Sequence, residues 1–189
     1  MAQFDYSDFF LFWFWKIKMA NENNVDGVHE NVEEPIPEKV INSMSEWTDL
    51  LKDPSHSRIL TLFLNVIDEV VNKPLSITGN DFCNLKTLTV NDISFGRTRR
   101  ITITGLDNLK SVTIGNYCFN EPERKSKNSI FNVTNCRNLK TITVGEQSLK
   151  RLRRFEVFDN PHLESITWEK GSFDECDVFS FSGTLVFSQ

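Results

Sequence analysis

"LDNLKSVTIGNYCF" (Leu106–Phe119) and "CRNLKTITVGEQSL" (Cys136–Leu149) are two versions of one pattern, in which a leucine precedes alternating apolar and polar residues. The core of the pattern is L-x-x-Φ-x-Φ, where Φ is an apolar residue. Its leading leucines are Leu85, Leu109, Leu139 and Leu163. Successive copies are 24, 30 and 24 residues apart, so the chain is built from internal repeats.

Two further sets of apolar residues keep the same phase. One set precedes the leucines by eight and six residues, as Ile101/Ile103, Phe131/Val133 and Phe155/Val157. The other set consists of Phe95, Phe119, Leu149 and Phe173. The 30-residue unit is a 24-residue unit with six extra residues inside Asn120–Ser129, because Phe119 to Phe131 takes twelve residues instead of six. Two short strand-like runs in each 24-residue period predict a solenoid, in which stacked units share one core.

The same spacing extends to both ends of the repeat region. Ile59–Leu64 together with Leu75 and Ile77 fits a degenerate first unit, although this segment is also compatible with a helix. A last unit begins at Phe179, Phe181 and Phe187. We therefore expect the solenoid to be truncated at its C-terminal edge, where end-to-end self-association or the remainder of a longer protein would cover the unpaired strand.

These motifs resemble a known family. L-x-x-Φ-x-Φ, the G-x-x-x-F at Gly115–Phe119 and the N-C-x-x-L at Asn135–Leu139 are similar to the leucine-rich repeats of the BspA-type surface-antigen class of bacteria and protists. The resemblance covers about residues 59–189 and departs from the common form in its six-residue insertion and in lacking proline after the strand. It implies a mainly β leucine-rich-repeat solenoid, adhesion or protein interaction at a cell surface, and no catalytic residues.

The sequence divides into three regions. Residues 1–37 are a hydrophobic N-terminus and an acidic linker whose composition predicts disorder. Residues 38–54 are expected to form a capping helix, because apolar residues recur at three- and four-residue steps between Glu38 and Lys52. Residues 57–189 form the predicted solenoid. Four Lys/Arg and eleven Asp/Glu give residues 1–53 a charge of −7, whereas seventeen and fifteen give residues 54–189 a charge of +2.

The N-terminal apolar run, Phe9–Trp15, is far shorter than the roughly 20 residues of a membrane-spanning helix. Asp5 and Asp8 stand where a signal peptide is basic, and no cleavage site follows directly. The run is compatible with a membrane-interface anchor, with a plug that packs on the solenoid, or with a misassigned gene start. Widely spaced cysteines without a C-x-x-C pair predict free, mostly buried thiols and favour a reducing compartment such as the cytoplasm.

One candidate binding surface is the strand face, because alternate residues of each strand point outward. Its outward residues are Lys86, Thr87, Thr89, Lys110, Ser111, Thr113, Lys140, Thr141, Thr143, Ser165 and Thr167. Rows of Thr-x-Thr resemble the surface of solenoid ice-binding proteins, but the lysines and serines interrupt such a plane. A purely structural role remains the alternative, since Thr is a good strand former.

A second candidate is a basic ridge, because stacking should bring three basic turns side by side. Its members are Arg97, Arg99, Arg100, Arg124, Lys125, Lys127, Lys150, Arg151, Arg153 and Arg154. The alternatives for its partner are the acidic leader of the same chain, an anionic membrane or glycan, and nucleic acid; the ridge is also compatible with solvated turns that bind no partner. Nucleic acid is disfavoured because no aromatic residues are interleaved for base stacking.

Enzymatic chemistry is not expected. His29, His56 and His162 are the three histidines, and none lies in a recognised nucleophile motif. No phosphate-binding glycine motif, metal-ligand spacing or cofactor motif is present. The sequence therefore predicts a non-enzymatic protein-interaction module that uses the strand face or the basic ridge. The alternative is a peripheral membrane or glycan-surface attachment protein that uses the basic ridge and the aromatic N-terminus.

Overall fold

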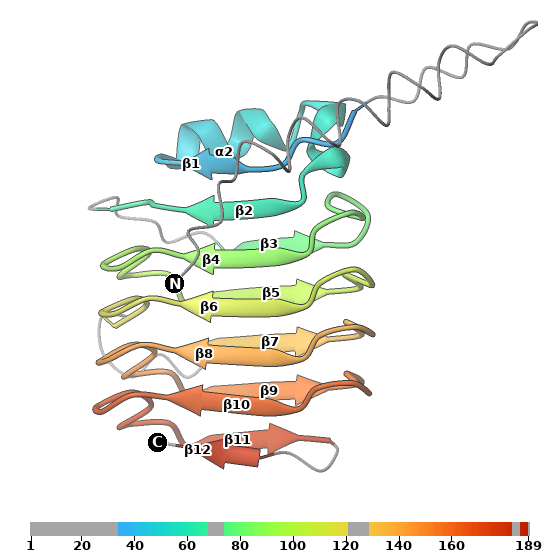
Figure 1. The fold of residues 1–189 in the computed structure, drawn as a ribbon. Helices are drawn as coiled ribbons and strands as arrows, with labels where there is room; N and C mark the ends of the chain where they lie inside the picture. Colours follow the sequence, from blue (N-terminus) through green and yellow to red (C-terminus); the bar gives the residue numbers. More distant parts are fainter. Residues whose placement is uncertain (1–33, 68–73, 121–128, 183–185, 189) are drawn as a thin grey trace, which may run out of the picture. The chain divides into compact units, whose positions relative to one another are not determined.

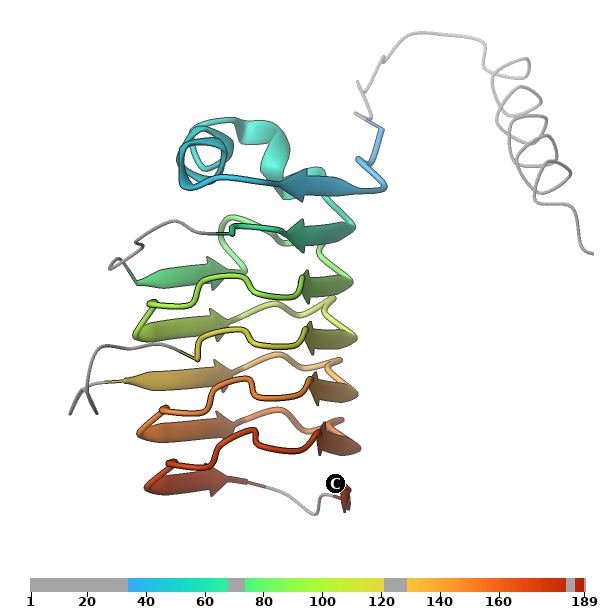
Figure 2. The same cartoon turned by 90° about the vertical axis from the view of Figure 1, so that its left-hand side faces the viewer.

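The computed structural model describes residues 34–67, 74–120, 129–182 and 186–188. Two parallel β-sheets face each other across a core, and the chain alternates between them coil by coil (Figures 1 and 2). The larger sheet has the strand order β1-β2-β4-β6-β8-β10-β12, and the smaller has the order β11-β9-β7-β5-β3. The protein is therefore a parallel β-solenoid of about five turns with a repeat of about 24 residues.

The elements are short, as the repeat requires. The seven-stranded sheet contains β1 (Lys39–Ile41), β2 (Thr61–Leu64), β4 (Thr87–Val90), β6 (Ser111–Ile114), β8 (Thr141–Val144), β10 (Ser165–Trp168) and β12 (Val186–Ser188). The five-stranded sheet contains β3 (Leu75–Thr78), β5 (Arg100–Thr104), β7 (Ile130–Thr134), β9 (Arg154–Phe158) and β11 (Val178–Phe181). The helical elements are α2 (Met44–Leu50) and the 3-10 helix η1 (Pro54–Arg58).

The predicted apolar columns form the core. Strands such as β4 and β6 alternate half-buried and buried residues, so one side of each sheet faces the other sheet. Equivalent residues of successive coils stack on one another: the Phe95 and Phe119 rings lie 5.6 Å apart, and the Phe131 and Phe155 rings lie 5.5 Å apart. The segment that was compatible with strand or helix is a strand, β2.

The extra six residues leave the sheets undisturbed. Ile101 in β5 pairs with Phe131 in β7, and Val112 in β6 pairs with Ile142 in β8, both across 30 residues. Residues 121–128, in which most of the insertion falls, lie outside the described residues. The predicted position of the insertion is confirmed, because the strands before and after it keep the register of the 24-residue units.

The turn between β8 and β9 shows how closely the coils approach. A Cβ atom on Gly145 would lie 2.5 Å from Asn116 Oδ1 and 2.8 Å from the carbonyl carbon of Gly115. Buried Ser148 spans the same gap, since its hydroxyl donates to the Gly115 carbonyl (2.6 Å) and accepts from the Cys118 amide (2.9 Å). The repeated glycine therefore reflects contact between neighbouring coils.

The N-terminal end of the solenoid carries a cap, as expected, but its helix is shorter than predicted. Lys39–Ile41 instead forms β1 along the edge of β2. The helix begins at Met44 because Ser43 caps it: the Ser43 hydroxyl accepts from the Glu46 amide. The Glu46 carboxylate in turn accepts from the amide of Asn42, the residue before the cap. Ile36, within the predicted linker, bridges to Ile59 and packs against the core.

Candidate functional site

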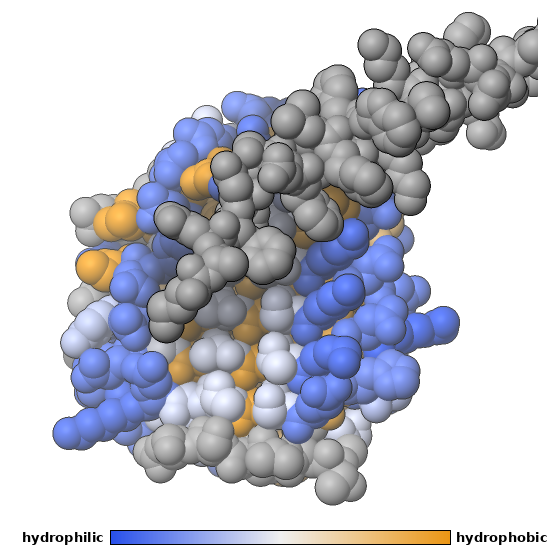
Figure 3. All heavy atoms as spheres, viewed as in Figure 1, coloured by the Kyte–Doolittle hydropathy of each residue, from blue (hydrophilic) through white to orange (hydrophobic). Residues whose placement is uncertain are grey.

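The outward hydroxyls of the seven-stranded sheet form two straight rows. The strand register aligns Thr87, Ser111, Thr141 and Ser165 in one row, and Thr89, Thr113, Thr143 and Thr167 in the other. Neighbouring strands are about 4.8 Å apart, and Thr167 Oγ1 donates to Thr143 Oγ1 at 3.4 Å. We call these eight residues the hydroxyl face; Figure 3 shows a pale band down this side of the molecule.

A lysine row borders the hydroxyl face where the strands begin. Lys86, Lys110 and Lys140 are exposed and stack through backbone hydrogen bonds of 2.8 and 2.9 Å. Lys140 Nζ pairs with Glu164 Oε1 at 3.0 Å. Within the described residues, Lys86 and Lys110 have no ion-pair partner. This border therefore carries uncompensated positive charge beside the hydroxyls.

The opposite border, where the strands end, exposes apolar side chains. Ile67, Ile93 and Tyr117 are all large and exposed, and we call them the apolar rim. Ile67 bridges to Ser94, and the Ile93 amide donates to the Asn116 carbonyl at 2.8 Å, so the three residues come from successive coils. Figure 3 shows a few apolar side chains among hydrophilic ones in the upper part of this side, and hydrophilic side chains on the other side.

Ile93 is the unusual member of the apolar rim. Its φ of 62° is left-handed, and its relative exposure is 56%. A left-handed conformation costs an L-residue roughly 1–2 kcal/mol, and a β-branched residue is an outlier there. The corresponding residues of the next coils, Tyr117, Gln147 and Gly171, are also left-handed, with φ of 57°, 55° and 76°, so the conformation belongs to the repeated turn. What distinguishes Ile93 is that a β-branched residue stands there and exposes apolar area.

Sequence reasoning missed the apolar rim, because an isoleucine or tyrosine close to a column of apolar residues is expected to be buried. The position of these residues in the repeat could have identified them. Ile93 and Tyr117 stand two residues before the buried Phe95 and Phe119, in a turn whose tight geometry points them outward.

The basic ridge is largely neutralised in its last turn. Each basic residue there pairs with an acidic residue: Lys150 with Asp174, Arg151 with Glu175 and Arg153 with Asp177, all at 3.7 Å, and Arg154 with Glu156. Arg97, Arg99 and Arg100 form no ion pair within the described residues. The remaining members, Arg124, Lys125 and Lys127, lie outside the described residues. The ridge therefore offers less free charge than its sequence indicates.

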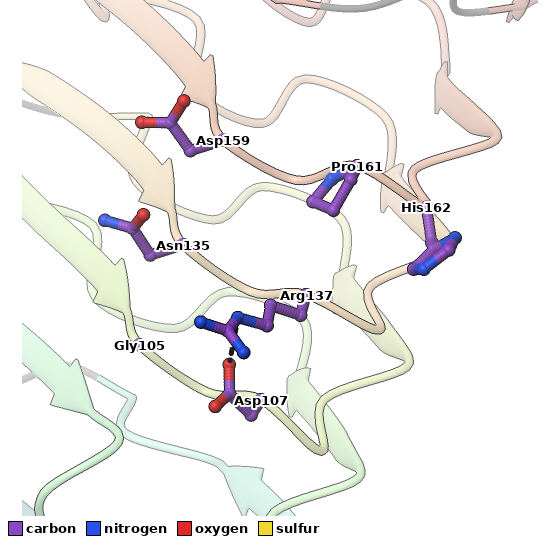
Figure 4. A pocket seen from close by; sticks show the side chains of 7 residues that line it. All are labelled: Gly105, Asp107, Asn135, Arg137, Asp159, Pro161 and His162. Atoms are coloured by element: carbon purple, nitrogen blue, oxygen red, sulfur yellow. Dashed lines mark ion pairs between the residues drawn. The ribbon is translucent and has the colours of Figure 1, made fainter.

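A shallow groove of about 660 Å³ crosses the turns that follow the five-stranded sheet (Figure 4). It is lined by Gly105, Asp107, Asn135, Arg137, Asp159, Pro161 and His162. Arg137 Nε lies 3.7 Å from Asp107 Oδ1, and both side chains are exposed. Arg137 and Asp107 pair with each other and the groove is open to water, so it offers neither a concentrated charge nor a shielded nucleophile.

The cysteines are free thiols, as predicted. Burial raises the pKa of Cys118 and of Cys136 to about 11, whereas Cys83 is exposed. Among the described residues no cluster of His, Cys, Asp and Glu could hold a metal ion. In that part of the chain, no helix has the length and hydropathy needed to cross a bilayer.

These observations define the class of protein as a capped parallel β-solenoid with a hydroxyl-bearing sheet face. No protein-family model, curated protein or solved structure matches the chain.

Proposed function

We propose that the protein is a non-enzymatic interaction module that binds an acidic protein surface across the hydroxyl face. The observation that carries this proposal is Ile93, which is strained, β-branched and exposed. The Ile93 amide is bonded to the Asn116 carbonyl of the neighbouring coil, whereas its side chain is open to water. A partner that covers this side chain would gain the free energy of burying its apolar area.

The apolar rim, the lysine row and the hydroxyl face would contribute to binding in different ways. The apolar rim supplies anchors, since Tyr117 belongs to the residue types that contribute most to protein interfaces. Lys86 and Lys110 attract acidic groups and raise the rate of encounter. The flat hydroxyl face between them can exchange hydrogen bonds with an extended segment, but Ser and Thr alone rarely dominate binding energy.

The test is affinity capture with the full chain from an extract of its source organism. Four proteins are compared: the parent, Ile93→Asn, Lys110→Glu and the control Thr102→Lys. Thr102 lies on the outer side of β5, in the opposite sheet. We expect one or more proteins to be captured by the parent and the control, and lost with Ile93→Asn and Lys110→Glu. Identical capture by all four would refute the proposal.

We also propose that the repeat is a divergent leucine-rich repeat of the BspA type, and that the protein takes part in adhesion. Its support is the placement of each L-x-x-Φ-x-Φ leucine just before a strand of the seven-stranded sheet. Homologous chains that share both this motif and the G-x-x-x-F turn would test the assignment.

Attachment to an anionic membrane or glycan is the alternative proposal, with Arg97, Arg99 and Arg100 as its described, unpaired basic residues. Its support is weaker because the last turn of the basic ridge is paired. Sedimentation with anionic vesicles decides it: binding should vanish when the three arginines are changed to glutamate, and unchanged or absent binding would refute it.

A further inference from the structure

The turns that follow the five-stranded sheet are tied together by a ladder of asparagines. Each of these asparagines stands directly before the leading leucine of its repeat, and its side-chain amide donates to a carbonyl of the preceding coil. The bonds run from Asn84 Nδ2 to the Ser57 carbonyl at 2.9 Å, from Asn108 Nδ2 to the Cys83 carbonyl at 2.8 Å and from Asn138 Nδ2 to the Asp107 carbonyl at 2.7 Å. The ladder therefore fixes each turn on the one before it.

The next coil departs from this ladder, because histidine replaces asparagine. His162 occupies the position of Asn138, and its side chain forms no hydrogen bond to any described residue. Buried Asn160 ties the coils instead: its Oδ1 accepts from the Cys136 amide at 2.9 Å, and its Nδ2 donates to the Val133 carbonyl at 3.0 Å. The His162 side chain is therefore not needed for stacking, and it lines the groove of Figure 4.

Two other side chains of the groove are also unoccupied. Asn135 and Asp159 directly follow β7 and β9, in the left-handed position that Gly105 takes after β5, with φ of 55° and 57°. The Asn135 amide donates to the Phe158 carbonyl at 3.3 Å, which fixes the two turns beside each other. Within the part of the chain that the structure describes, neither side chain forms a hydrogen bond or an ion pair. Figure 4 shows the amide and the carboxylate pointing the same way from successive coils.

The lining of the groove limits the chemistry of a ligand. Its charged groups are the carboxylates of Asp107 and Asp159 and the guanidinium of Arg137, which pairs with Asp107. An anionic ligand would meet the unpaired carboxylate of Asp159, and an apolar ligand would find only the ring of Pro161. A sugar fits better, because each of its hydroxyls both donates and accepts. Asn135 offers two N–H donors and one oxygen acceptor beside the carboxylate acceptor of Asp159.

We propose that this groove is a binding site for a neutral carbohydrate. Asn135 and Asp159 bind neighbouring hydroxyls of one sugar, His162 bonds a hydroxyl at the other end of the groove, and Pro161 packs against the C–H groups of the sugar ring. Successive coils are about 4.8 Å apart, so a linear glycan along the groove presents hydroxyls to one turn after another. The site uses no residue of the hydroxyl face, the lysine row or the apolar rim, and it is independent of the protein partner proposed above.

The test is binding of the full chain to immobilised neutral oligosaccharides, namely glucans, mannans, xylans and galactans, with sulfated glycans on the same array. Two variants install a residue that another coil already holds at the equivalent position. Asp159→Gly copies Gly105, which is left-handed at φ 68°, and His162→Asn copies Asn138. The control is Glu169→Gln, which removes an exposed charge after the end of β10, whereas the groove lies before that strand begins.

We expect the parent and Glu169→Gln to bind at least one neutral glycan equally well. Asp159→Gly and His162→Asn should each bind the same glycan about tenfold more weakly, the effect of losing one strong hydrogen bond. Both variants should unfold at the temperature of the parent or above it, because each restores a residue that the repeat accommodates. Thermal unfolding followed by circular dichroism checks this and separates loss of binding from loss of folding.

A parent that binds no neutral glycan on the array would overturn the proposal. Folded Asp159→Gly and His162→Asn variants that bind as tightly as the parent would also overturn it, because the glycan would then lie elsewhere. Binding to the sulfated glycans alone would overturn it as well and would indicate the basic ridge instead.

Discussion

Replacing Ile93 with asparagine should stabilise the solenoid while weakening the proposed interaction. Ile93 has a left-handed backbone, φ 62°, which its branched Cβ makes unfavourable, and 56% of the residue is exposed. Asparagine is several-fold enriched in left-handed conformations, so most of the roughly 1–2 kcal/mol strain should be relieved. Loss of the partly buried apolar area offsets a fraction of this gain. The expected net increase in the free energy of unfolding is about 1 kcal/mol, or roughly 2–4 °C in Tm for a domain of this size.

The assay is thermal unfolding of the full chain followed by circular dichroism, with Ile93→Val as the matched control. Valine is also β-branched and keeps the backbone strain, so Ile93→Val should be no more stable than the parent. The reasoning would be refuted if Ile93→Asn were no more stable than Ile93→Val. A variant that is more stable yet no longer captures the partner separates loss of contact from loss of folding.

Three further predictions concern the stacking of the coils and the thiols. Gly145→Ala should lower the free energy of unfolding by about 1–3 kcal/mol, because its Cβ would overlap the neighbouring coil. Gly96→Ala is the control and should be near neutral or slightly stabilising, since the nearest atom would lie at 3.8 Å; equal losses in urea unfolding would contradict the account. Ser148→Ala should cost about 2–4 kcal/mol in the same assay, because it leaves a buried amide and carbonyl without their hydroxyl partner, and a loss below about 0.5 kcal/mol would show that the coils re-form without it. With iodoacetamide at pH 8, Cys83 should react in the native protein while Cys118 does not, because Cys118 is buried and its pKa of about 11 keeps it protonated at pH 8. Mass spectrometry that found both labelled alike would refute this.

Much of the solenoid could be predicted because its local pattern and its long-range contacts repeat with the same period. Leu109 and Leu139 are separated in the sequence by one repeat unit and its insertion, and the strands that follow them pair in register. The cap was harder to predict. Val40 and Ile41 fit a helical face with Trp47, but the free edge of β2 offers them backbone partners, so they form a strand and the helix begins after Ser43.

Of the candidate sites, one could be predicted from the sequence and one could not. The hydroxyl rows followed from strand alternation alone, because every coil presents Thr87 or its counterpart to the same side. The pairing of Arg151 with Glu175 did not, because it depends on which turn lies beside which. Free charge was therefore overestimated wherever an acidic turn stacks on a basic one.

The sequence by itself determined the repeat length, the two strands of each coil and the place of the insertion, because hydrophobic periodicity and the turn residues specify them locally. The tertiary structure decided which apolar residues remain exposed. Ile93 is exposed in a left-handed turn whose amide donates to Asn116 of the neighbouring coil, and Arg151 is paired because Glu175 lies beside it. Exposure is a property of what lies beside a residue, and the sequence does not carry that information at any single position.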